Sequence, residues 1–257
     1  MKKIYLVPNL VTTANMFSGF YSIISSSHHE FSTAAWAIVA AGVFDMLDGR
    51  IARLAKATSQ FGVEYDSLSD LLSFGVAPAF LLYQWSLEPY DRLGWIVAFL
   101  YLVCGALRLA RFNVTTAVQP KGFFQGLPIP MAAGVVATFV LFSDKIQWQD
   151  AAKSPVVVPM TVGLAGLMVS TLPFPSFKEL NWRSRATFGY MMLGLLLMVL
   201  VVINPEMTLF ISLSAFICLS LLRYVFGLIF RRDLVGTAPA ESGVNEGSSA
   251  TAYEKRT

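Results

Sequence analysis

The sequence predicts an all-α, polytopic membrane protein: a bundle of about eight transmembrane helices. Hydrophobic residues make up 55% of the 257 residues, and charged residues only 14%. The mean hydropathy is +0.60, whereas a soluble domain carries about 25% charged residues. Apolar runs long enough to cross a bilayer recur along the chain. The composition argues against a soluble domain, and a net charge of only +3 indicates no nucleic-acid partner.

Polar turns separate the apolar runs and set the expected ends of the helices. In the first half of the chain, residues 28–30 follow the first run and residues 88–89 follow the third. In the second half, residues 144–145 and 204–205 do the same after the fifth and seventh runs. The expected helices cover residues 7–27, 31–54, 61–85, 92–113, 127–143, 156–173, 187–203 and 207–230.

The chain is expected to form one membrane-embedded domain, residues 1–232, followed by a disordered cytoplasmic tail, residues 233–257. Gly, Ser, Ala, Thr and Glu dominate the tail, where no apolar period remains. The first apolar run lacks a signal-peptide cleavage pattern, so it is expected to be retained as a helix.

The basic residues predict that both termini lie in the cytoplasm. With that orientation, only Arg92, Lys145 and Lys153 of the 19 Lys and Arg residues fall outside. Such a bias is typical of cytoplasmic loops. The other sixteen lie on or near the cytoplasmic side: Lys2, Lys3, Arg50, Arg53, Lys56, Arg108, Arg111, Lys121, Lys178, Arg183, Arg185, Arg223, Arg231, Arg232, Lys255 and Arg256.

Four aspartates stand close together where the second predicted helix ends and the third begins. Asp45 and Asp48 are three residues apart, and Asp66 and Asp70 are four apart, so each pair shares one helix face. An ionised carboxylate within a membrane helix costs about 2.5–3.5 kcal/mol, and mutual repulsion adds to that cost. A divalent cation would reverse this balance. Because the cluster offers only oxygen ligands, it favours Mg²⁺ or Mn²⁺ over zinc.

Two glycines accompany the aspartates. Gly49 follows Asp45 by four residues and Gly62 precedes Asp66 by four, so both lie on the acid-bearing faces. The absence of a side chain there lets a substrate or a neighbouring helix approach closely.

The aspartates could instead serve a purpose other than binding a cation at a fixed site. They could form a solvated surface paired with Arg50, Arg53 and Lys56. They could also line the path of a cation transporter, which would spread acids across the depth of the membrane. The expected clustering at one end argues against a transporter.

One spacing joins these residues: D-x2-D-G-x2-A-R-x8-G-x3-D-x3-D, from Asp45 to Asp70. It resembles the signature of the CDP-alcohol phosphatidyltransferases. The resemblance implies that Asp45, Asp48 and Asp66 hold one divalent ion, and that Asp45, Asp66 and Asp70 hold a second. It also implies that Asp70 is the general base for the acceptor hydroxyl. The residues implied to bind the cytidine diphosphate part of CDP-diacylglycerol are Asn9, Thr12, Gly49, Arg53, Ser59 and Gly62.

Three further stretches resemble the integral-membrane phosphatidylserine synthases of this family, which use CDP-diacylglycerol and L-serine. These stretches are residues 8–19, 107–113 and 124–130. The candidates for serine contact are Arg108, Arg111 and Asn113, since a guanidinium pairs well with a carboxylate.

The choice of serine as acceptor leaves alternatives open. Arginines would also serve glycerol phosphate or inositol phosphate, so a sister transferase that uses another alcohol is possible. The arginines could instead anchor lipid phosphates or neutralise the acids. The expected partners are the two substrates and the membrane lipids. A homodimer is a further option, because homodimers are common in the family, but the sequence leaves the oligomeric state open.

Overall fold

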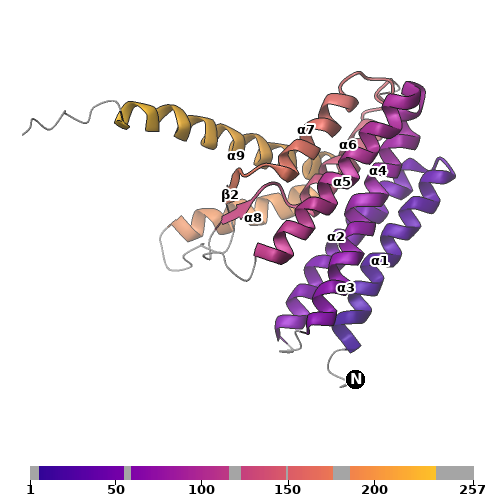
Figure 1. Ribbon diagram of the computed structural model, residues 1–257, viewed down its shortest axis with the longest axis horizontal. Coiled ribbons are helices and arrows are strands. Elements are labelled where there is room, and N and C mark those ends of the chain that lie inside the picture. Colours follow the sequence, from indigo (N-terminus) through magenta and orange to yellow (C-terminus); the bar gives the residue numbers. More distant parts are fainter. Residues whose placement is uncertain (1–5, 55–58, 116–122, 149, 176–185, 236–257) are drawn as a thin grey trace, which may run out of the picture. The chain divides into compact units, whose positions relative to one another are not determined.

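The computed structural model describes residues 6–54, 59–115, 123–148, 150–175 and 186–235, and these residues are almost entirely helical (Figure 1). The chain divides into two compact units, Met1–Ser220 and Leu221–Thr257. The described part of the second unit is the end of the last helix. The α-helices are α1 (Leu6–Ser27), α2 (Phe31–Leu54), α3 (Gln60–Asp70), α4 (Ala77–Leu82), α5 (Asp91–Thr115), α6 (Ile129–Lys145), α7 (Val157–Val169), α8 (Ala186–Ile203) and α9 (Pro205–Val235).

The all-α prediction is confirmed, with one small addition. The strands β1 (Phe123–Gln125) and β2 (Pro173–Pro175) pair antiparallel, with Phe124 opposite Phe174. They join the connector after α5 to the connector after α7. The sixth predicted helix, residues 156–173, was therefore too long, because α7 ends at Val169 and Pro173 lies in a strand.

The third predicted helix, residues 61–85, is not one regular α-helix. Between α3 and α5 the backbone alternates between α-helix and wider π-helical turns, at Leu71–Val76 and Tyr83–Leu87. Pro78 gives a reason, because proline has no N–H for the carbonyl four residues earlier, that of Phe74. The buried Tyr101 hydroxyl donates a hydrogen bond to that carbonyl instead, at 3.3 Å.

Helices α3 to α5 form a hairpin with its turn after a short 3₁₀ segment, Glu88–Tyr90. Asp91 adopts a left-handed φ of 47° there. Helix α5 then packs back against both π-helical segments, and α1 packs most extensively against α2. Small residues of α2 allow close packing against its neighbours α1 and α6, since Ala34, Ala35 and Ala41 are completely buried.

Three described helices are long and apolar enough to cross a membrane, judged by length and composition. They are Phe31–Leu54, the helical run Gln60–Val114 that contains the hairpin, and Pro205–Tyr224. Val157–Val169 is apolar but shorter. The number of eight spans therefore stays a prediction, although helices occur at all eight predicted places.

Several predictions fall outside the described residues. These include most of the expected tail, residues 236–257, whereas α9 continues to Val235, past the expected start of the tail at residue 233. The basic residues that lie outside are Lys2, Lys3, Lys56, Lys121, Lys178, Arg183, Arg185, Lys255 and Arg256.

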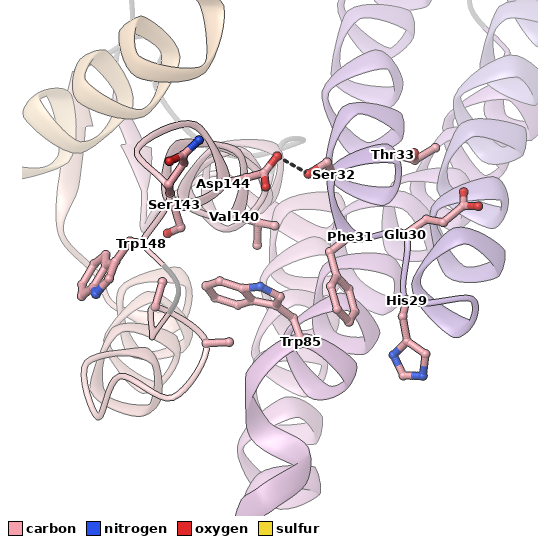
Figure 2. A pocket seen from close by; sticks show the side chains of 13 residues that line it. His29, Glu30, Phe31, Ser32, Thr33, Trp85, Val140, Ser143, Asp144 and Trp148 are labelled. Atoms are coloured by element: carbon pink, nitrogen blue, oxygen red, sulfur yellow. Dashed lines mark hydrogen bonds between the residues drawn. The ribbon is translucent and has the colours of Figure 1, made fainter.

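A cavity of about 770 Å³ lies at the start of α2, bounded by the end of α6 and the turn that follows it. Figure 2 shows the side chains of Phe31, Trp85 and Val140 around this cavity, and a hydrogen bond between Ser32 and Asp144. The Ser32 hydroxyl donates to the Asp144 carboxylate at 2.8 Å. Phe31 and Asp48 are 17 residues apart on one helix, a distance of about 25 Å at 1.5 Å per residue. This cavity therefore lies far from the aspartates, and none of the predicted site residues lines it.

Candidate active site

The structure brings three of the four aspartates together. Asp45 and Asp48 lie near the end of α2, and Asp66 lies in α3, which follows in sequence. One carboxylate oxygen of each lies within 4.8 Å of the others. Asp48 is only 5% exposed. The i,i+3 spacing on α2 places Asp45 and Asp48 on one face, and α3 brings Asp66 up to that face.

Asp70 lies beside this group. Its carboxylate is close enough to that of Asp45 for the two charges to interact. In addition, the side-chain amide of Asn15 on α1 donates a hydrogen bond to Asp70 Oδ1 at 3.3 Å. Asp70 is the last residue of α3, and the first π-helical segment begins directly after it.

The aspartate cluster has the features of a cation site rather than of a salt-bridged surface. Among the described residues, neither Arg50 nor Arg53 forms an ion pair with any of the four aspartates. The buried atoms Asp48 Oδ2 and Asp66 Oδ1 have no hydrogen-bond partner in the described part of the chain. Buried carboxylate oxygens without partners are costly unless a cation neutralises them. The donor set is made of hard oxygens, so the residues fit Mg²⁺ or a similar divalent ion.

A cavity of about 180 Å³ adjoins the cluster on the side of α1. All six residues that the sequence predicts for nucleotide binding line it, together with Asp48 and Asp66. They come from three separate places in the fold: the first turns of α1, the end of α2, and the start of α3. The six are Asn9, Thr12, Gly49, Arg53, Ser59 and Gly62.

Ser59 shapes this cavity by starting α3. Its backbone is extended, and its hydroxyl accepts a hydrogen bond from the Gly62 N–H at 3.0 Å, which makes it the N-cap of the helix. A Cβ on Gly62 would lie 3.2 Å from this hydroxyl. Within the described part of the chain, a Cβ on Gly49 would contact only the Arg53 guanidinium, at 3.6 Å. Gly49 therefore leaves room for a ligand rather than for a neighbouring helix.

A second cavity, of about 200 Å³, lies further along α3, where α3 faces α5. Val63 and Asp66 line both cavities, and Asp70 lines only this second one. Arg108 and Asn113 of α5 also line it, as expected of residues that contact the acceptor.

Arg108 is a buried cation directed at the acids. It is 8% exposed, and the charges of Asp70 and Asp45 attract it. Its guanidinium carbon lies 5.6 Å from the centre of the Phe112 ring, a cation–π contact that helps to fix it.

Arg111 is placed differently from the other two candidates for serine contact. It is not among the residues that line the second cavity. Its guanidinium donates hydrogen bonds to the carbonyls of Val169, Met168 and Ser170, at 2.8, 3.3 and 3.1 Å. These carbonyls end α7, where no further turn of the helix can satisfy them. The contacts made by Arg111 are those of a helix cap.

Sequence reasoning did not assign two residues that the structure brings to the site. Ser67 lines the second cavity, and the Asn113 amide donates a hydrogen bond to its hydroxyl at 3.0 Å. Asn15 holds Asp70. Asn15 follows Thr12 by three residues and Asn9 by six, so a polar face of α1 was visible in the sequence. The sequence did not show that Asp70 is the partner of Asn15 on that face.

Known proteins resemble this chain over most of its length. The family model described as CDP-alcohol phosphatidyltransferase matches residues 5–172. A CDP-diacylglycerol–serine O-phosphatidyltransferase of Helicobacter pylori is 36% identical over 226 residues, which cover 88% of this chain and 94% of that protein. A protein of the same name from Bacillus subtilis is 35% identical, and the match covers 67% of this chain and 92% of that protein. A further one, from Methanocaldococcus jannaschii, is 36% identical, and the match covers 69% of this chain and 77% of that protein.

These matches extend beyond the aspartate signature, which occupies only 26 residues, to the helices on either side of it. The chain belongs to the CDP-alcohol phosphatidyltransferase family. It is an integral membrane protein, as its apolar helices and its family indicate.

Proposed function

We propose that the protein transfers the phosphatidyl group of CDP-diacylglycerol to the hydroxyl of L-serine, which gives phosphatidylserine and CMP. The observation that carries this proposal is the pair of adjoining cavities along α3, which share Asp66. One has the residues expected for a nucleotide, and the other has a buried arginine suited to a carboxylate. The relatives named for this reaction support the choice of substrates.

The first cavity is proposed to hold the cytidine diphosphate part of the donor. Asn9 and Thr12 on α1 and Ser59 at the start of α3 supply polar groups for the nucleotide. Arg53 is exposed and supplies positive charge at the rim. Gly49 and Gly62 let the pyrophosphate approach the backbone without a side chain between them.

Asp45, Asp48 and Asp66 are proposed to hold a divalent ion, Mg²⁺ or Mn²⁺, as the oxygen-only donor set favours. A second ion on Asp45, Asp66 and Asp70 is a further prediction from the family signature. When bound, such ions orient the pyrophosphate and neutralise the charge that develops on the leaving CMP. The carboxylates would supply the ligands and fix the ions between the two cavities.

The acceptor serine is proposed to occupy the second cavity. Arg108 would pair with the serine carboxylate, which fixes the orientation of its hydroxyl. Asn113 and Ser67 offer polar groups on the opposite wall. Arg111 was an equal candidate in the sequence, but its contacts with the end of α7 favour Arg108 for this role.

Asp70 is proposed to accept the proton of the serine hydroxyl. The serine oxygen forms a bond to the β-phosphorus of CDP-diacylglycerol, the bond from that phosphorus to the CMP oxygen breaks, and CMP leaves with the electron pair. Phosphoryl transfer depends mainly on position and electrostatics, so a well-placed carboxylate suffices as the base. Asp70 lines the acceptor cavity, as this role requires.

The deciding experiment measures CMP release by the purified protein in mixed micelles with CDP-diacylglycerol and Mg²⁺. Each assay contains one acceptor: L-serine, glycerol 3-phosphate, inositol phosphate or inositol. We expect release with L-serine and formation of phosphatidylserine. Release with another alcohol but not with serine would contradict the choice of acceptor while keeping the family chemistry. Divalent-cation flux into liposomes without CDP-diacylglycerol would instead support a transporter.

The acid-bearing end is proposed to face the cytoplasm, with both termini on the same side. Arg50, Arg53 and Arg108 lie at this end, whereas Lys145 adjoins the distant cavity, which supports the positive-inside assignment. This orientation is tested by fusing a reporter enzyme to the C-terminus. A reporter that is active only outside the cytoplasm should show no activity in this fusion. A homodimer is proposed from family resemblance, and the mass of the detergent-solubilised protein measures it.

A further inference from the structure

Asn15 is a completely buried polar residue beneath the reacting groups. It is 0% exposed and is not among the residues that line either cavity. Its side-chain nitrogen donates to Asp70 Oδ1 at 3.3 Å. Its side-chain oxygen has no hydrogen-bond partner among the described residues. Because burial of a half-satisfied amide is costly, this residue contributes less to stability than an apolar side chain of similar size would.

The backbone around Asn15 is held by contacts that do not involve its side chain. One turn before it, the Ser69 hydroxyl donates to the Thr12 carbonyl at 3.1 Å. The Ser73 hydroxyl donates to the carbonyl of Asn15 itself at 3.0 Å. One turn after it, a Cβ on Gly19 would lie 2.6 Å from the Ser73 Cα. These contacts fix α1 against the helix that carries Asp70, and they place the Asn15 amide at a defined point.

We propose that Asn15 is a positioning residue for Asp70, an inference that rests on the proposed transferase function. The amide occupies one oxygen of the Asp70 carboxylate and leaves the other for the acceptor hydroxyl. It also determines which way Asp70 turns. Asp70 lines the acceptor cavity and lies near Asp45, and without the amide its carboxylate can rotate away from that cavity. In that orientation it would no longer present an oxygen to the acceptor hydroxyl.

The test compares Asn15→Leu and Asn15→Ala with the wild type. The first has a similar volume and the second removes the amide altogether, and both lack the donor. Because the backbone contacts use Thr12, Ser69, Ser73 and Gly19, both variants are expected to fold. Ser22→Ala is the matched control, since Ser22 is also 0% exposed on α1 and its hydroxyl has no partner among the described residues.

We expect both variants to lower kcat by about 10- to 100-fold, as misplacement of a catalytic group does. The KM for CDP-diacylglycerol and the elution volume of the solubilised protein should change little, and the control should match the wild type. Values of kcat within about twofold of wild type in both variants would overturn the inference, as would an equal loss in Ser22→Ala. If the wild type releases no CMP with any acceptor, the proposed function itself has failed.

Discussion

Replacement of Arg111 by leucine separates a structural arginine from a substrate-binding one. Its guanidinium donates to three carbonyls at the end of α7, and two of these bonds are partly buried. A buried polar group left without its partner costs about 1–3 kcal/mol. Two such carbonyls predict a loss of about 2–6 kcal/mol of stability. For a chain of this size, at about 2–4 °C per kcal/mol, that loss lowers the Tm by about 4–24 °C.

Arg108→Leu should instead weaken the binding of serine and leave the Tm close to that of the wild type. Arg108 is 8% exposed and lines the acceptor cavity, whereas α7 does not depend on it. The loss of a charge-assisted contact worth about 1.5–3 kcal/mol raises the KM for serine by about 10- to 150-fold. The KM for CDP-diacylglycerol should change by less than about threefold. Arg50→Leu is the control for loss of a positive charge, because Arg50 is exposed and near the same end.

The assay has two parts, each made on all three variants. Thermal unfolding in detergent gives the Tm, and CMP release at varied serine, well below the lowest Tm, gives the KM. The structural role of Arg111 is contradicted if Arg111→Leu keeps the wild-type Tm and raises the KM for serine as much as Arg108→Leu does. In that case Arg111 would contact the acceptor, and its place at the end of α7 would be incidental.

Three further changes test other parts of the site. Gly49→Ala should raise the KM for CDP-diacylglycerol by about tenfold or more without loss of stability, since among the described residues its Cβ would meet only Arg53. Gly42→Ala is the control on the same helix, because its Cβ would meet no described residue within 4 Å. Gly126→Ala should lower the Tm, because Gly126 has a φ of 79° and its Cβ would lie 2.5 Å from the Met168 carbonyl oxygen, and the left-handed conformation alone costs about 1–2 kcal/mol. Removal of divalent ions with EDTA should abolish CMP release, and Mg²⁺ or Mn²⁺ should restore it; activity that survives complete chelation would contradict the assignment of the aspartates as ligands.

Local patterns in the sequence predicted the features that depend on residues close together in the chain, namely the helix ends and the faces that the aspartates share. The helix ends agree with the polar turns to within a few residues, apart from the sixth helix, and the aspartate spacing predicted which acids share a face. The contacts of Arg111 and Asn15 were beyond such patterns. Their partners are 57–59 and 55 residues away along the chain. Nothing in the spacing from Arg108 to Arg111 distinguishes an arginine that faces a cavity from one that caps another helix.

The wall that the two cavities share has a consequence for the order of events in a catalytic cycle. Val63 and Asp66 line both cavities, and the other lining residues are different in each. Neither substrate therefore has to leave before the other can enter. Such an arrangement favours a direct, sequential transfer through a ternary complex over a ping-pong scheme with a phosphatidylated enzyme. Without acceptor, the protein should not exchange labelled CMP into CDP-diacylglycerol.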